Sequence, residues 1–327
     1  MTRIGWSIPV FMVMLPFMTH RKSMSTDTIH RMKLTEWFML VSLSIIWGGS
    51  FFFNAIALRG MPPLLVVWGR VGVGFLGLVC ILALSSLEVR QYLNRWRDFL
   101  VLGVFNTFIP FSLIVWGQQY IGSGLASIIN ATTPAFTIVV AHFFTRDEPA
   151  SVRRLFGAAV GLLGVAVLIG TDALSGFGNH VFAQFAIMGA ALSYACAATY
   201  GRRLYGVPSM VTACGQLFSS FLVMTPVVLL SCRPWEMAFP GYDALGAVLG
   251  LGLICSALAY VLFFRILRTA GATNVQLVTL LIPLSASAMG IFILGEPFSW
   301  RLIVAMLIVF TAAALIDGRF SLRRSRR

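Results

Sequence analysis

Two prolines, Pro134 and Pro283, interrupt long apolar segments of this chain at matching positions. Because proline has no N–H, the carbonyl four residues earlier in a helix loses its usual donor. Those carbonyls belong to Asn130 and Thr279, so the pattern predicts two backbone acceptors beside polar side chains, as in helices broken to bind a ligand inside a membrane. The alternative is a packing kink whose carbonyl is satisfied by a neighbouring helix or by a Ser or Thr hydroxyl.

Other polar and aromatic side chains of the apolar segments could face the same interior site. The further candidates are Trp47, Asn106, Ser127, Thr133, Tyr194, Tyr260 and Gln276, with Asn54 and Asn274 as additional polar groups. A buried hydroxyl or amide can equally join two helices, which contributes about 0.6–2 kcal/mol. Trp47, with Trp68 and Trp116, could line an apolar cavity or anchor the chain at a membrane interface.

Arg70 lies well inside an apolar segment, and Gln216 occupies the corresponding place in the second half of the chain. An arginine at the centre of a membrane helix costs at least ~2.5 kcal/mol, so it needs water, a carbonyl or an anion. Facing a cavity, it could bind a substrate carboxylate with two parallel hydrogen bonds. Alternatively, it could extend to the membrane surface near Arg59.

Acidic residues are missing from the middle of every apolar segment. Proton-coupled carriers usually bury a carboxylate or histidine, whereas Glu148, Glu296 and His142 lie at segment ends. We therefore expect no proton relay, and we expect Glu148 and Glu296 to cap the turns around them. The histidines and cysteines form no cluster with metal-ligand spacing, and no phosphate-binding or nucleophile motif is present, so no metal, cofactor or catalytic residue is predicted.

The composition is that of a membrane protein: 58% of the residues are hydrophobic and 11% are charged, against about 25% charged in soluble domains. The apolar runs are about 20 residues long and do not alternate, which favours helices over a barrel. They predict an all-α integral membrane fold with ten spans, at 36–57, 64–85, 98–117, 121–144, 151–170, 182–201, 209–231, 243–264, 272–294 and 300–317.

The basic residues mark one side of the predicted membrane. Alternate loops hold Arg90, Arg95, Arg97, Arg146, Arg153, Arg154, Arg202, Arg203, Arg265 and Arg268, whereas the other loops hold Arg59, Arg233 and Arg301. Positive residues stay in the cytoplasm, so both termini are predicted to be cytoplasmic, consistent with an even number of spans. The net charge of +13 is therefore a topology signal, and nucleic acid is not an expected partner.

The chain contains an internal repeat. Gly122 corresponds to Gly271, Pro134 to Pro283, and the string E-P-x-S-x-R occurs at both Glu148 and Glu296. The units are 36–172 and 182–317, between an amino extension (1–35) and a basic tail (318–327). Each unit holds five spans, so the second enters from the other side, which gives two inverted-topology five-helix repeats. For 1–33 we expect a dispensable extension, with Met24 and Met32 as alternative starts, or else an interfacial helix.

Several strings resemble the EamA family of the drug/metabolite transporter superfamily. They are LSIIWGGSF from Leu43, GSGLASIINATTP from Gly122, and the segment from Gly271 through Pro283 to Glu296 and Pro297. The resemblance covers the whole chain except its two ends and implies ten helices and export or exchange of amino acids and similar metabolites. One departure is Cys196, which stands where Trp47 would align.

The repeat pattern and the family resemblance together predict an alternating-access carrier in a bacterial inner membrane. It would move small, partly apolar metabolites outward as a facilitator or exchanger, with a small-molecule substrate and the lipid bilayer as its partners, as a monomer or homodimer. A non-transporting membrane scaffold or sensor is the alternative, and an intramembrane enzyme is a further one.

Overall fold

The computed structural model describes residues 32–85, 87–144, 152–169, 179–275 and 277–317, and its regular structure in these residues is helical. Seven helical stretches are long and apolar enough to cross a membrane: Leu34–Ala57, Pro63–Ala83, Val89–Gly117, Ser123–Phe144, Asn179–Leu204, Ser209–Cys232 and Tyr242–Ala270. Shorter apolar helices cover Leu155–Gly164, Val278–Phe292 and Trp300–Ala312. Residues 1–31 of the amino extension, the basic tail, Glu148 and Gln276 lie outside the described residues.

The first half contains α1 (Leu34–Ala57), α2 (Pro63–Ala83), α3 (Trp96–Gly103), α4 (Ile109–Gly117), α5 (Ser123–Asn130), α6 (Thr133–Phe144) and α7 (Val152–Ile169). The second contains α8 (Asn179–Gly201), α9 (Ser209–Cys232), α10 (Tyr242–Leu249), α11 (Ala259–Ala270), α12 (Ala272–Val275), α13 (Val278–Phe292) and α14 (Trp300–Asp317). The predicted spans 121–144 and 272–294 are thus each divided into two helices.

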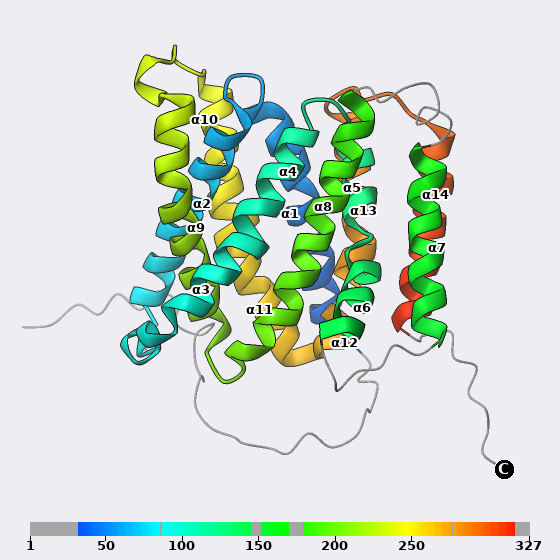
Figure 1. The fold of residues 1–327 in the computed structure, drawn as a ribbon, viewed down its shortest axis with the longest axis horizontal. Helices are drawn as coiled ribbons and strands as arrows, with labels where there is room; N and C mark the ends of the chain where they lie inside the picture. Colours follow the sequence, from blue (N-terminus) through cyan, green and yellow to red (C-terminus); the bar gives the residue numbers. More distant parts are fainter. Residues whose placement is uncertain (1–31, 86, 145–151, 170–178, 276, 318–327) are drawn as a thin grey trace, which may run out of the picture.

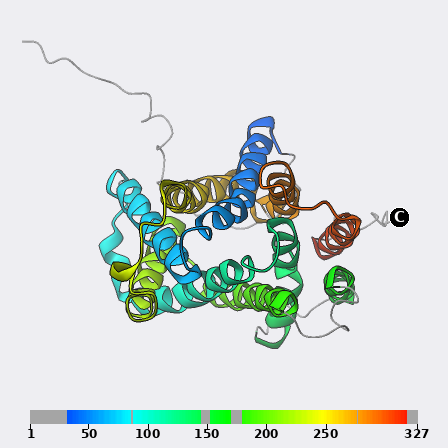
Figure 2. The same cartoon turned by 90° about the horizontal axis from the view of Figure 1, so that it is seen from above.

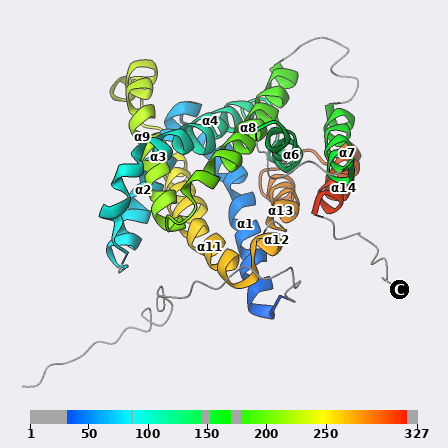
Figure 3. The ribbon, with the colours of Figure 1, turned by 60° about the horizontal axis from the view of Figure 1, so that its bottom comes forward.

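The helices run between two ends of the molecule (Figure 1). One end, at the bottom of Figure 1, carries the start of α1, the end of α14 and the connections α2–α3, α8–α9 and α11–α12. We call it the basic end, because these connections include Arg90, Arg95, Arg202 and Arg203. Figure 3 turns this end forward. The far end carries the connections α1–α2, α4–α5, α9–α10 and α13–α14. Seen from above, α7 and α14 form a pair beside the other helices (Figure 2).

The third predicted span of each half contains a π-helical segment, which the sequence did not indicate. Val104–Phe108 joins α3 to α4, and Gly250–Leu258 joins α10 to α11. The wider turn alters the backbone pairing, and hydroxyl groups bond to carbonyls of both segments: Ser193 Oγ donates to Phe105 at 2.7 Å, and Ser256 Oγ to Leu251 at 3.0 Å. Such segments are frequent at functional sites.

Close backbone approach holds these π segments against α2 and α9. A Cβ on Gly252 would lie 2.5 Å from Val73 on α2, and a Cβ on Gly103, the residue directly before the first π segment, would lie 2.7 Å from the carbonyl oxygen of Gln216 on α9. Small residues permit such contact between membrane helices. The packing therefore fixes each π segment beside the second predicted span of the other half.

Candidate functional site

Two polar contacts join the halves of the molecule in a symmetric way. Arg70 on α2 donates from Nε to Ser256 Oγ in the second π segment, at 3.2 Å. Gln216 on α9 accepts at Oε1 from Asn106 Nδ2 in the first π segment, at 3.0 Å. Arg70 and Gln216 are repeat partners, and each lies about two turns into its helix. Each half thus supplies one long side chain and one π-segment partner to a single cluster.

Arg70 is 6% exposed, so its side chain does not extend to the surface as one interpretation of the sequence allowed. Its guanidinium carbon lies 3.9 Å from the centre of the Phe111 ring, a favourable cation–π contact. The side chains of Tyr194, Tyr260 and Cys255 lie near the guanidinium. Three elements from the two halves, α4, α8 and α11, therefore surround the charge together with the second π segment.

No acidic side chain among the described residues pairs with Arg70. The ion pairs of the described part of the chain join Arg95 to Asp98 and Arg233 to Glu236, near the two ends. Within the described residues, the Arg70 side chain donates one hydrogen bond, to Ser256 Oγ. A buried charge with so few partners is costly, and an anion bound beside it would relieve that cost.

Gln216 extends the cluster toward the basic end. Its Nε2 donates to the Tyr260 hydroxyl at 2.8 Å, and the Tyr260 ring stacks on Phe264 with centroids 5.9 Å apart. Gln216 is 4% exposed. Tyr260 and Phe111 keep the sequence spacing of Gly271 and Gly122, so each half also contributes one aromatic ring. Of the residues predicted from sequence, Arg70, Asn106, Tyr194 and Tyr260 are brought together here.

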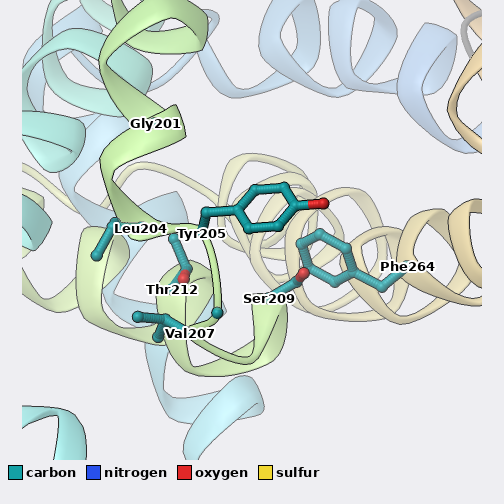
Figure 4. Close-up of a pocket in the computed structure, with 8 residues that line it drawn as sticks. Gly201, Leu204, Tyr205, Val207, Ser209, Thr212 and Phe264 are labelled. Carbon is teal, nitrogen blue, oxygen red and sulfur yellow. The ribbon is translucent and has the colours of Figure 1, made fainter. Parts of the chain in front are cut away.

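A pocket of about 310 Å³ opens at the basic end next to this cluster (Figure 4). Its lining comprises Gly201, Leu204, Tyr205, Gly206, Val207, Ser209, Thr212 and Phe264. Thr212 lies one turn before Gln216 on α9, and Phe264 one turn after Tyr260 on α11. The inner wall of the pocket is therefore one helical turn from the hydrogen-bonded pair Gln216–Tyr260. Sequence reasoning missed this pocket, whose signal was the short Gly206-containing turn.

The first proline break does not expose the acceptor predicted from sequence. The helix ends at Asn130 and restarts at Thr133, so Pro134 occupies the first turn of α6, where no N–H is needed. Thr133 Oγ1 donates to the Asn130 carbonyl at 2.7 Å, and Thr132 Oγ1 donates to the Ile129 carbonyl at 2.7 Å. Both carbonyls are satisfied by hydroxyls, which corrects the expectation of a free acceptor. The Asn130 side-chain oxygen is buried without a hydrogen-bond partner in the described residues.

The other proline-associated candidates also lie on α5, α6 and α13. Pro134 borders a small void of about 10 Å³ shared with Gly161 on α7 and Val309 on α14, so it faces the α7–α14 pair. Pro283 lies inside α13, and Thr279, on the same helix, has an interaction partner. Ser127 Oγ donates to the Gly124 carbonyl within α5. The described contacts do not connect these residues to Arg70.

Trp47 packs at the edge of the cluster. Its ring lies 5.5 Å from that of Phe263 on α11, and Phe263 in turn lies 5.3 Å from Phe264. Cys255 in the second π segment donates from Sγ to the carbonyl of Ile46, the residue before Trp47. Trp47 therefore supports the aromatic residues around Tyr260.

At the far end, a carboxylate ties the two halves together. Glu296, in the α13–α14 connection, accepts the backbone N–H of Ser123 at 2.7 Å and that of Gly124 at 3.4 Å. A Cβ on Gly122 would lie 2.7 Å from Glu296 Oε2, so the glycine leaves room for the carboxylate, as does Gly290 on α13. The sequence predicted that Glu296 caps the turn around it, whereas in the structure its carboxylate caps the start of α5 in the other half.

A second far-end contact is centred on Gln118, which sequence reasoning did not select. Its Oε1 accepts from Asn54 Nδ2 on α1 at 2.9 Å, and its Nε2 donates to the Phe51 carbonyl at 2.9 Å. Asn54 and Gln118 are both buried. Together with Glu296, this contact joins α1, α4, α5 and the α13–α14 connection.

Comparison with known proteins agrees with this architecture. The EamA-like transporter family matches residues 34–170 and 181–317. The chain is 22% identical to the uncharacterized transporter YoaV of Bacillus subtilis, covering 87% of this chain and 97% of YoaV. It is 27% identical to the uncharacterized transporter YvbV of the same organism, covering 86% and 91%.

A third relative is the uncharacterized inner membrane transporter YedA of Escherichia coli, with 26% identity over 86% of this chain and 90% of YedA. A solved crystal structure of a protein superimposes with a TM-score of 0.62 at 19% identity, covering 86% of this chain and 96% of that chain, and this likeness concerns the fold. With both halves matched and its relatives named as transporters, this multi-pass membrane chain belongs to the EamA-like transporter family of the drug/metabolite transporter superfamily.

Proposed function

We propose that this protein is an alternating-access carrier whose substrate binds at the cluster around Arg70 and Gln216. The substrates are small, partly apolar metabolites that carry a carboxylate, such as amino acids and related compounds, and they move outward. The buried Arg70, which no acidic side chain of the described residues neutralises, is the observation that supports this proposal most strongly. Intramembrane ionisable residues of this kind mark substrate pathways.

In this proposal the chain crosses the membrane ten times, as two inverted five-helix repeats. The direction of the helices supports it: α1 begins at the basic end, whereas α8, which opens the second half, begins at the far end (Figure 1). In the contacts Arg70–Ser256 and Gln216–Asn106, a side chain from the second predicted span of each half bonds to the π segment of the other half, as expected for a pseudo-two-fold axis. By the positive-inside rule, the basic end and both termini are cytoplasmic, and the relative YedA suggests an inner membrane.

The contacts at the two ends suggest which side the site faces. Glu296 and Gln118 tie helices together at the far end, whereas the basic end holds the pocket beside Gln216 and Tyr260. We assign this arrangement to the state that is open toward the cytoplasm. Transport then requires the contacts of Glu296 and Gln118 at the far end to break while the basic end closes. Substrate binding shifts the equilibrium between these two conformations.

The carrier works as a facilitator or exchanger, because no aspartate or glutamate lies in the middle of a predicted span. The test is counterflow in proteoliposomes with labelled amino acids and related carboxylates, with and without a pH gradient. Gln216→Leu removes the contacts to Asn106 and Tyr260, so uptake should fall strongly. Glu236→Gln, at an exposed surface pair, is the matched control and should leave uptake unchanged.

Counterflow that is independent of the pH gradient and lost in Gln216→Leu would support the carrier and its site. Uptake that follows the pH gradient would refute the facilitator mechanism. If no compound undergoes counterflow in protein that is folded and monodisperse, the carrier function itself is refuted, and a scaffold role gains weight.

A further inference from the structure

The charge of the cluster discriminates between zwitterionic α-amino acids and carboxylic acids that lack an amino group. Its contacts consist of the Arg70 guanidinium and neutral groups: the hydroxyls of Ser256 and Tyr260 and the amides of Asn106 and Gln216. An α-amino acid that places its carboxylate on Arg70 brings its ammonium within about 5–6 Å of the same guanidinium. No acidic side chain of the described residues contacts Arg70 to balance the second positive charge.

The energetic consequence follows from Coulomb's law in a partly desolvated site. Two like charges at this separation disfavour the zwitterion by about tenfold or more in affinity, even at the high effective dielectric that protein sites show. The same acid without its amino group keeps the attraction to Arg70 and avoids this repulsion. The site thus favours a net negative charge.

The apolar surroundings define the rest of the substrate. Phe111 covers one face of the guanidinium, and the rings of Tyr260 and Phe264 stack beside the entrance. Tyr194, on α8, lies near the guanidinium. These surfaces suit a compact apolar or aromatic body that bears one carboxylate.

The entrance at the basic end is positively charged, as is Arg70. The pocket residues Leu204 and Tyr205 directly follow Arg202 and Arg203, which are exposed. Phe264, on the other wall, is followed by the exposed Arg265. Positive charge around a concave entrance raises the local concentration of anions and speeds their entry.

We propose that the protein carries organic monoanions, each a single carboxylate on a compact apolar body, in preference to zwitterionic amino acids. The substrate enters the pocket at the basic end, passes the pair Gln216–Tyr260 and places its carboxylate on Arg70. This inference rests on the proposed carrier function and narrows its substrate class from carboxylates in general, amino acids included, to carboxylates without an amino group.

The test compares acids that differ only in an amino group. Equilibrium binding to the purified full chain is measured for butyrate, 4-methylpentanoate and 3-phenylpropionate, each against the α-amino acid of the same carbon skeleton. We expect at least one acid to bind about tenfold or more tightly than its amino acid. Tighter binding of the amino acid, or binding of neither member of any pair, overturns the anion preference.

Variants at the two equivalent positions assign the charge. Arg70→Gln should weaken acid binding about tenfold or more, whereas Arg70→Lys should retain most of it. The double variant with Arg70→Gln and Gln216→Arg returns a cation to the same cluster and should recover part of the affinity, an outcome that general damage to the fold would not produce. Arg233→Gln, at an arginine that is 63% exposed, is the matched control and should bind as the wild type does.

Binding that is unchanged in Arg70→Gln would overturn the assignment to Arg70. Counterflow in proteoliposomes separates this inference from the proposed function. Transport of an amino acid with no transport of its matched acid overturns the anion preference and leaves the carrier function standing. Absence of counterflow for every compound overturns both.

Discussion

The far-end cap offers a prediction that can be worked from the structure. Glu296 accepts two backbone N–H groups at the start of α5, from Ser123 and Gly124. Glu296→Gln keeps the size of the side chain and removes its charge. One amide oxygen can still accept a single N–H, but the amide NH₂ group would face the second N–H as another donor. The substitution therefore weakens the cap without deleting the side chain.

The expected magnitude combines two contributions. A negative charge at a helix N-terminus stabilises by about 0.3–1 kcal/mol when exposed and by up to ~2 kcal/mol when partly buried. Loss of a helix cap typically costs about 1 kcal/mol. Because the charge and the cap are the same group in Glu296, the two figures overlap, and we expect about 1–2 kcal/mol. This corresponds to a five- to thirty-fold change in the opening equilibrium of the α5 N-terminus.

Hydrogen–deuterium exchange of the full chain in nanodiscs measures this opening directly. Peptides covering 118–130 should lose protection by five- to thirty-fold in Glu296→Gln. Glu236→Gln is the matched control, because the same substitution at the same end removes a carboxylate that is 57% exposed and paired with Arg233. Surface pairs of this kind contribute little, so protection at 118–130 should not change. Unchanged protection in Glu296→Gln, or an equal loss in the control, would refute the cap.

Three further predictions concern packing and charge movement. Gly252→Ala should destabilise the protein by about 1–3 kcal/mol in thermal unfolding, because the new Cβ would lie 2.5 Å from Val73. Gly246 has open space within 4 Å, so Gly246→Ala should be neutral or slightly stabilising. Equal effects of the two substitutions would contradict the close packing against α2. Trp68→Phe should cost about 0.5–1.5 kcal/mol in the same assay through the lost 2.9 Å bond to Thr225, and no loss would show that the bond contributes nothing. If the carrier is a facilitator of a monoanion, an imposed membrane potential should change the equilibrium accumulation of this anion in proteoliposomes about tenfold per 59 mV, whereas an accumulation insensitive to potential would contradict the facilitator and favour electroneutral exchange.

The contacts that could be predicted from the sequence follow from repeat equivalence and from the burial of charge. The internal repeat by itself aligns Arg70 with Gln216. A charged residue inside an apolar segment must face the interior of the helix bundle or reach the membrane surface. Glu296 could be expected to cap because a carboxylate at the end of a span seeks free N–H groups. The partner of Glu296 could not be predicted, because capping of α5 depends on how the two halves meet.

The π segments, and the outcome of each proline interruption, lay beyond prediction for a local reason. Val104–Phe108 reads as ordinary apolar helix, and its Phe105 carbonyl is bonded by Ser193 from another helix. At the first break, the threonines beside Pro134 satisfy the carbonyls, whereas Pro283 lies within a continuous α13. A proline removes one donor, and the neighbouring side chains decide whether a new helix starts or the old one continues.

The departure from symmetry at the centre of the molecule carries the functional argument. A strictly symmetric chain would place arginine at both 70 and 216, and two guanidinium groups in one buried cluster would repel each other while each lacked an acidic partner. Gln216 keeps a hydrogen bond to the opposite π segment and adds one to Tyr260, so the contact between halves is retained without a second charge. The repeated scaffold can then supply two similar arrangements that exchange during transport, while the single charge at Arg70 selects what is carried.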